Sequence, residues 1–93
     1  MPFTGDTYSL NGPWNPLPGV YGIMNSRSQI IYIGETDDFN RRIAEHRADT
    51  THCMHRYGPA LVRAEVVTGG EVARRDRERI LIAEYLPPCN QVA

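Results

Sequence analysis

The stretch GVYGIMNSRSQIIYIGET, residues 19–36, restricts the possible folds more than any other part of this 93-residue chain. Two apolar strings flank the polar segment NSRS, a pattern typical of two strands joined by a loop of about four residues. We expect Met24 to pair with Gln29 beside the loop. The sequence therefore predicts an antiparallel hairpin in which Tyr21 lies opposite Tyr32.

Side chains alternate between the two faces of a sheet along each strand. One predicted face of the hairpin carries Tyr21, Ile23, Ile30 and Tyr32, with Ile23 opposite Ile30, and the other carries Val20, Met24, Ile31 and Ile33. Both faces are apolar, so we expect the rest of the chain to cover both.

Two helices and one more strand are predicted after the hairpin. The segment TDDFNRRIAEHR is typical of a helix that Thr36 or Asp37 caps, and LVRAEVV is typical of a strand that ends before two glycines. The last helix runs from Glu71 to about Leu86, because two prolines follow. The expected fold class is α/β of the α+β type: a small three-stranded antiparallel sheet flanked by helices, in the order β-β-α-β-α.

Proline and glycine recur through residues 1–18, so no periodic pattern is sustained there. We expect an irregular N-terminal arm over residues 1–18, with Trp14 anchoring it, and a single domain over residues 19–93. The segment ADTTHCMHRYGPA is expected to be a loop with a short helical turn at most.

Several classes of protein are disfavoured by simple counts. No apolar run approaches the roughly 20 residues of a membrane helix, and the N-terminus lacks an export pattern, so we expect no membrane association and a cytoplasmic location. Cys53 and Cys89 are too few for a disulfide framework, and each is expected to be a reduced thiol. The formal net charge of −1 means that any nucleic-acid binding depends on locally placed arginines.

Three charged or polar residues interrupt the predicted apolar faces of the helices. At 100° per residue, Arg42 and His46 share a side with apolar residues of the first helix, whereas Arg41 and Glu45 point elsewhere. Glu78 lies at the centre of the apolar stripe of the last helix. Burying a lone carboxylate costs several kcal/mol, so Glu78 needs a partner.

Structural explanations for these residues stay open at this point. Glu78 forms either an internal salt bridge with Arg42 or part of a functional site. The stem of Arg42 can cover Phe39 while its charged end reaches solvent. His46 alone is explained by a satisfied histidine at the edge of the core.

The motifs GVY at residues 19–21 and YIG at 32–34, separated by ten residues, resemble the GIY-YIG nuclease family. YIGETDDFNRRIAEH resembles the family's strand followed by the helix of its catalytic arginine, which selects Arg42. ERILIAEYLPPCN resembles the closing segment, with Glu78 as the glutamate and Asn90 as the final asparagine. The resemblance extends over residues 19–90.

Two features depart from the family pattern. Val20 replaces the middle isoleucine of the first motif, which changes volume but no chemistry. The sequence stops soon after the closing asparagine, without the DNA-recognition domain that many family members append, so target choice is left open.

The resemblance implies hydrolysis of DNA phosphodiester bonds with one divalent cation, Mg²⁺ or Mn²⁺. Glu78 would be the metal ligand, Arg42 would stabilise the phosphate, and Tyr21 would act as the base with Tyr32 orienting the water or phosphate. A nearby cation or arginine is expected to favour the phenolate form of the base. His46 would donate to a phosphate oxygen or relay a proton. The implied substrate-binding residues are Gly34, Arg42, Arg56 and Asn90, with Asn90 also a structural cap near the site.

DNA is therefore the expected partner, and a protein partner or a second copy of the chain is a candidate source of target recognition. DNA repair, recombination, mobile-element and defence roles stay open. One alternative is a DNA-binding or repair accessory module without catalysis. Another is a zinc-stabilised domain built from His52, Cys53 and His55, joined by His46 or Cys89.

Overall fold

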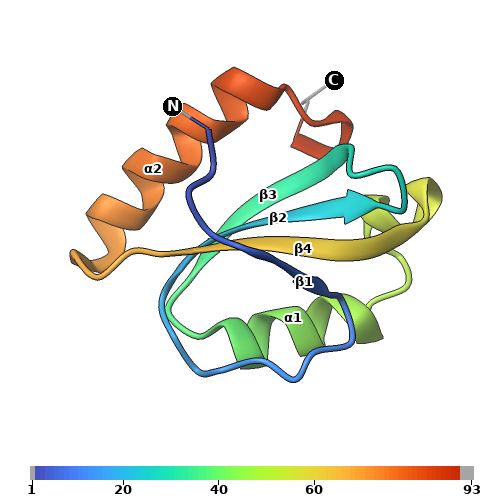
Figure 1. Ribbon diagram of the computed structural model, residues 1–93, viewed down its shortest axis with the longest axis horizontal. Helices are drawn as coiled ribbons and strands as arrows, with labels where there is room; N and C mark the ends of the chain where they lie inside the picture. Colours follow the sequence, from blue (N-terminus) through green and yellow to red (C-terminus); the bar gives the residue numbers. More distant parts are fainter. Residues whose placement is uncertain (1, 91–93) are drawn as a thin grey trace.

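A computed structural model describes residues 2–90 of the chain (Figure 1). The strands are β1 (Thr7–Ser9), β2 (Gly19–Asn25), β3 (Ile30–Thr36) and β4 (Pro59–Val66). The helices are α1 (Phe39–Ala48) and α2 (Gly70–Tyr85), with two short 3₁₀ helices, η1 (Cys53–Tyr57) and η2 (Pro88–Asn90). The predicted helical turn after α1 is therefore confirmed as η1.

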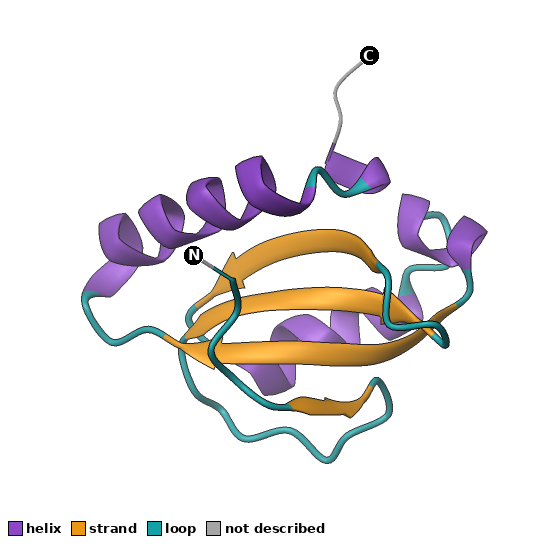
Figure 2. Ribbon diagram, turned by 45° about the horizontal axis from the view of Figure 1, so that its top comes forward, coloured by secondary structure: helices purple, strands orange, loops and turns teal. Residues whose placement is uncertain are grey.

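The sheet lies between the two long helices, with α1 on one face and α2 on the other (Figures 1 and 2). Within residues 2–90 it has four antiparallel strands in the order β1-β4-β2-β3. The α+β class is confirmed, but the prediction of three strands and the order β-β-α-β-α are wrong. The additional strand is β1, which belongs to the segment predicted to be irregular and pairs with the free edge of β4. Three exposed residues are too few to give a periodic sequence signal.

The hairpin of β2 and β3 forms, but its predicted register is wrong. Tyr21 lies opposite Gly34, Ile23 opposite Tyr32, and Met24 opposite Ile30. The loop accounts for one residue of the shift, because the Asn25 N–H donates to the Gln29 carbonyl at 3.1 Å and closes the turn one residue later than expected.

A shift of two residues leaves each side chain on its predicted face, so Tyr21, Ile23 and Tyr32 still share one face. The second residue of this shift comes from a bulge next to Ile23, which adds one residue to β3. As a result Ile31 packs with the core on the α1 face and Ile30 packs on the α2 face, the reverse of the prediction.

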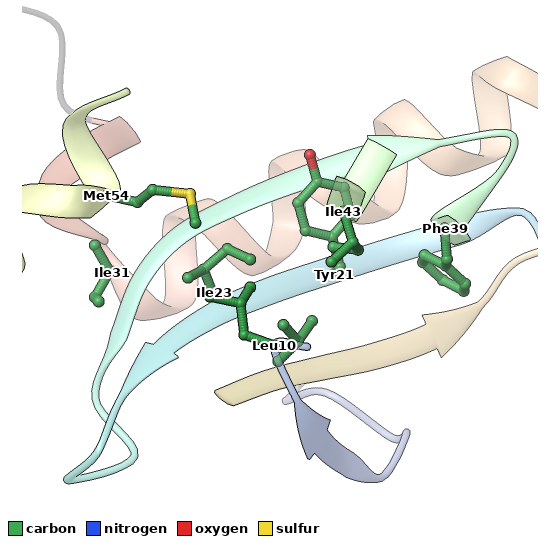
Figure 3. Close-up of a cluster of buried hydrophobic side chains, with 8 residues drawn as sticks. Leu10, Tyr21, Ile23, Ile31, Phe39, Ile43 and Met54 are labelled. Atoms are coloured by element: carbon green, nitrogen blue, oxygen red, sulfur yellow. The ribbon is translucent and has the colours of Figure 1, made fainter. Parts of the chain in front are cut away.

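Two hydrophobic clusters hold the helices to the sheet. The cluster on the α1 face is formed by Leu10, Tyr21, Ile23, Ile31, Phe39, Ile43, Met54 and Val62 (Figure 3). The cluster on the α2 face is formed by Phe3, Val20, Ile33 and Leu81. Trp14 packs against the first cluster and donates to the Leu10 carbonyl at 3.3 Å, which confirms its anchoring role.

The helix ends follow capping rules with small displacements from the prediction. Asp38, and neither Thr36 nor Asp37, caps α1 by accepting a hydrogen bond from the Arg41 N–H. Thr36 is the residue that shapes the turn before the cap, since its hydroxyl accepts from the Asp38 N–H at 3.0 Å. Helix α2 ends before Leu86, which adopts a left-handed conformation ahead of Pro87.

Cys53 and Cys89 are joined in a disulfide, with their Cα atoms 5.7 Å apart. The prediction of two reduced thiols is wrong, because η1 and η2 meet in space although the cysteines are 36 residues apart in sequence. Within residues 2–90, neither helix combines the length and apolar character that crossing a bilayer requires.

Candidate active site

A hydrogen bond between Tyr21 and His46 lies at the centre of the candidate site. The Tyr21 hydroxyl and His46 Nε2 are 2.7 Å apart, and the two residues are 1% and 2% exposed. Tyr21 comes from the middle of β2, whereas His46 comes from the last turn of α1 and points back to the sheet. This pairing of strand and helix makes a buried polar contact on an otherwise apolar face.

Burial controls the protonation of both partners. It raises the pKa of Tyr21 above the usual range of a phenol, Tyr32 adds to the rise, and Arg42 opposes it. Burial, with help from the charge of Arg42, lowers the pKa of His46 to about 4. Both groups are therefore neutral at pH 7: Arg42 does favour the phenolate of Tyr21, as expected, but burial outweighs its effect on the pKa.

Tyr32 stands beside this pair within a small group of rings. Its ring centroid is 6.3 Å from that of Tyr21 and 5.5 Å from that of His46. His52 is the residue before η1. Its ring packs edge-on against the rings of Tyr32 and His46, with centroid distances of 4.7 Å and 4.8 Å. The four rings join β2, β3, α1 and the start of η1.

Gly34 leaves room for the Tyr21 hydroxyl. A Cβ atom at position 34 would lie 2.4 Å from that oxygen, far inside van der Waals contact. The two residues are direct partners in the sheet, so the glycine of the YIG motif lets the phenol cross over β3 toward His46.

Arg42 lies at the rim of the same group. Its side chain is 41% exposed and forms an ion pair with Glu45 at 3.1 Å. It nevertheless approaches both phenols closely enough to lower the pKa of each. Arg42 therefore lies on the predicted side of α1 with its charged end at the rim, and its ion pair is with Glu45, whereas the salt-bridge alternative had paired it with Glu78.

Glu78 reaches the candidate site from α2, past the free edge of β3. It is half-buried, and its negative charge contributes to the raised pKa of both Tyr21 and Tyr32. Burial, followed by the nearby carboxylate of Glu35, raises the pKa of Glu78 itself. A cation is favourable beside a carboxylate whose pKa is raised by burial and by a second carboxylate.

Side chains, and not another strand, form hydrogen bonds with the main chain along the outer edge of β3. The Ile33 N–H donates to Asn90 Oδ1 at 2.7 Å, and Asn90 Nδ2 donates to the Ile33 carbonyl at 2.9 Å. Two residues further along the same edge, the Glu35 N–H interacts with the Glu78 carboxylate. Asn90 is therefore a structural clamp on the strand that carries Tyr32, and its contact with substrate stays a prediction.

A polar hollow of about 450 Å³ opens next to Arg42. It is lined by Glu35, Thr36, Asp37, Arg41, Arg42, Glu45, Glu71 and Arg74. Arg56 lies apart from this hollow, exposed on η1, so its predicted role in substrate binding depends on a substrate that extends along that segment.

Sequence reasoning missed Glu35, Arg74 and His52. Arg74 Nε donates to Glu35 Oε2 at 2.8 Å, and both side chains are largely buried. The available signal for Glu35 was a charged residue inside the apolar β3 pattern. His52 had been assigned to a zinc alternative, but the sulfurs of Cys53 and Cys89 are bonded to each other and cannot serve as thiolate ligands in this state.

Comparison with known families identifies the chain. The GIY-YIG catalytic domain matches residues 17–91. The chain belongs to the GIY-YIG family. No curated protein sequence matches it at a significant level.

Several solved structures of one GIY-YIG domain are similar to the chain. The magnesium-bound N-terminal endonuclease domain of UvrC from Thermotoga maritima is 26% identical, with a TM-score of 0.71 over 84% of this chain and 88% of that one. A tyrosine-to-phenylalanine variant of the same domain, bound to its catalytic divalent cation, is 26% identical with a TM-score of 0.71 over 85% and 88% of the two chains. An asparagine-to-alanine variant, also bound to the cation, is 25% identical with the same TM-score and coverage. The family and fold are thus shown together.

Proposed function

We propose that this GIY-YIG chain is an endonuclease that hydrolyses DNA phosphodiester bonds with the help of one divalent cation, Mg²⁺ or Mn²⁺. The observation that carries the proposal is the meeting of the buried Tyr21–His46 hydrogen bond with Arg42, one turn before His46 on α1, and with Glu78 from α2. A neutral acid–base pair beside a cation-binding carboxylate and an exposed guanidinium suits phosphoryl chemistry.

Glu78 is the proposed ligand of the cation. Among residues 2–90, no three histidine, cysteine, aspartate or glutamate side chains gather as a preformed cage, so the cation would keep several waters, as Mg²⁺ does. When bound, the cation would polarise the phosphate and stabilise the departing oxygen. The cation-bound UvrC domains, some with tyrosine or asparagine variants, support a cation at this fold.

Arg42 is the proposed phosphate-binding residue. Its guanidinium is exposed enough to meet a substrate, and the nearby phenols and Glu45 hold it beside the tyrosines. Donation to a non-bridging oxygen would stabilise the negative charge that builds up in the transition state.

Tyr21 and His46 are the proposed proton path. A phenol whose pKa is raised does not ionise in advance, so we infer that Tyr21 accepts the proton of the attacking water as its own proton passes to His46. In the tautomer whose Nε2 carries no proton, His46 can accept this proton from the Tyr21 hydroxyl, 2.7 Å away. Its burial favours this relay over direct donation to a phosphate oxygen, while Tyr32 is left to orient the water or phosphate.

Nicking of supercoiled plasmid with and without Mg²⁺ tests the proposal. Glu78→Gln is expected to lower the nicking rate by roughly 10²–10³-fold or more, and Tyr21→Phe to slow it by roughly 10²–10⁴-fold, the usual range for general acid–base catalysis. Asp76→Asn is the matched control for charge, because Asp76 is an exposed acid on the same helix. Equal nicking by wild type and Glu78→Gln would contradict the proposal, whereas DNA binding without cleavage by the wild type would support the accessory-module alternative.

The proposed location is the cytoplasm, where the substrate would be chromosomal or foreign DNA. Similarity to the UvrC domain makes repair one candidate pathway. Matched duplex, branched, flapped and single-stranded substrates in the same assay distinguish repair or recombination intermediates from linear duplex. A higher nicking rate per molecule of the chain, when a protein partner is added or when the chain is more concentrated, would indicate that a partner or a second copy helps in target recognition.

A further inference from the structure

The Cys53–Cys89 disulfide joins two short segments, η1 and η2, that lie together next to β3 and the candidate site. Cys53 opens η1 and Cys89 lies in η2, and both are half-buried. Each cysteine is the direct chain neighbour of a residue that supports β3 or its rings.

On the η1 side, that neighbour is His52. Its ring packs against Tyr32 and His46 at 4.7 and 4.8 Å, and its Nδ1 accepts a hydrogen bond from the Met54 N–H at 3.1 Å. Met54 in turn is fully buried in the α1-face core. The position of Cys53 is thus coupled to the rings of the candidate site.

On the η2 side, the neighbour is Asn90. Its side chain makes both hydrogen bonds to the Ile33 main chain, at 2.7 and 2.9 Å. Ile33 follows Tyr32 directly, so Asn90 clamps the edge strand at the point where the phenol enters the site. Segment η2 is only three residues long and begins with Pro88, so it has little helical structure of its own to hold the clamp in place.

We propose that Cys53–Cys89 is a reversible thiol–disulfide site that controls the order of the β3 edge. In the oxidised chain, the bond ties the Asn90 clamp to η1 and so to the core. In the reduced chain, the Asn90 amide loses this tether, and Ile33 and Tyr32 become less fixed. One consequence rests on the proposed function: the reduced chain cuts DNA more slowly than the oxidised chain.

The exchange requires a dithiol reductant, and its electrons balance. A thiolate of the reductant attacks one of the two half-buried sulfurs, the Cys53–Cys89 bond breaks, and a mixed disulfide forms. The second thiol of the reductant then attacks the mixed disulfide and releases the protein sulfur that was bound in it. The chain gains two electrons and two protons as two thiols, and the dithiol becomes a disulfide.

Amide hydrogen exchange on the full chain, oxidised and reduced with dithiothreitol, tests the proposal. We expect the Ile33 amide to exchange roughly tenfold faster after reduction, while the Val62 amide at the sheet centre changes far less. The double variant Cys53→Ser/Cys89→Ser should show fast Ile33 exchange with and without dithiothreitol. Alkylation and mass measurement should count two thiols only after reduction.

Two results would overturn the proposal: Ile33 exchange that is the same in both states, or a chain whose cysteines stay unlinked in oxidised glutathione. Plasmid nicking in both states then tests the consequence for activity. If Ile33 exchange responds to reduction but neither state nicks DNA, the proposed nuclease function fails while the thiol–disulfide control of β3 stands.

Discussion

Two polar clusters on opposite faces of the sheet differ in how burial affects their charges. On the α2 face, Glu65 accepts two hydrogen bonds from Arg77, at 2.6 and 3.0 Å, and one from the Thr4 N–H at 3.0 Å. Burial alone raises the pKa of Glu65, but these partners outweigh it and lower that pKa below its usual value. On the α1 face, burial prevails: Tyr21 and His46 are held neutral.

The difference shows which cluster is built for stability and which for chemistry. A buried charge that has all its partners fixes the fold and has no capacity left for a ligand. A buried group held in its neutral form, next to a carboxylate with a raised pKa, retains a proton or a ligand position that it can exchange. Glu65 and Glu78 both lie on the α2 side of the sheet. Of the two, only Glu78 has a raised pKa and a position that a proton or ligand can exchange.

The largest expected effect is on catalysis, and it separates these two glutamates. Glu78→Gln should lower the nicking rate by roughly 10²–10³-fold or more, as loss of one electrostatic contact at a reacting centre does. Its free energy of unfolding should stay the same or rise slightly, because the repulsion from Glu35 is relieved. Single-turnover nicking and urea unfolding of the same samples measure both. A large loss of stability would place Glu78 with the structural cluster.

The second effect is a pH dependence of stability from His46. Its pKa falls from 6.5 in the unfolded chain to about 4 in the folded one. Between these values the unfolded chain binds a proton that the folded chain does not, so stability falls as the pH drops from 6.5 to 4, by roughly 3 kcal/mol in total. Urea unfolding at several pH values should show this slope.

His46→Gln is the control for that slope. The amide keeps a polar partner for the Tyr21 hydroxyl but does not titrate, so the curve of the variant should be flatter above pH 4.5. Glu65 contributes a loss of its own as the pH falls through its lowered pKa, and this loss remains in the variant. Equal slopes would mean that His46 is accessible to protons in the folded chain.

Glu65→Gln should give the next effect, on stability alone. Removing one member of a buried ion pair costs about 3–5 kcal/mol. Because Arg77 is partly exposed and also donates to the Pro2 carbonyl at 2.7 Å, we expect roughly 2–3 kcal/mol. The nicking rate of the folded variant should be that of the wild type. A reduced rate at full folding would link the α2-face cluster to the candidate site.

How far the sequence predicted these clusters depends on the range of the interactions. The shared face of Tyr21 and Tyr32 was predictable, because alternation within a strand survives a two-residue error in register. His46 and Arg42 were found on the correct side of α1, because the helical period is local.

What the sequence did not reveal depends on contacts between distant segments. Glu65 and Arg77 meet only after α2 folds back over the sheet, and Glu35 meets Arg74 from 39 positions away. The disulfide and strand β1 were missed for the same reason. No local pattern predicts that a three-residue stretch pairs with the edge of β4, or that two cysteines far apart in the sequence form a disulfide.

Gly34→Ala should have a smaller effect that falls on the chemical cluster. Alanine gains about 0.5–1 kcal/mol over glycine in a strand, but its Cβ would overlap the Tyr21 hydroxyl at 2.4 Å, and overpacking costs about 1–3 kcal/mol. We expect a net loss of about 1–2 kcal/mol and slower nicking, since Tyr21 must move away from His46. Unchanged nicking would show that the position of the hydroxyl is not critical.

Asp76→Asn should have the smallest effect and calibrates all the others. Asp76 pairs with Arg79 at 2.9 Å, but the side chains are 55% and 78% exposed. Water already solvates both charges, so the pair contributes under about 0.5 kcal/mol. The variant removes the same charge as Glu65→Gln and Glu78→Gln, and from the same helix as the latter. If it unfolds at the urea midpoint of the wild type and nicks DNA at the same rate, the effects at Glu65 and Glu78 follow from where these carboxylates lie. A shift in the urea midpoint as large as that of Glu65→Gln would instead mean that the loss of a charge, and not the burial of the carboxylate, causes the effects at these sites.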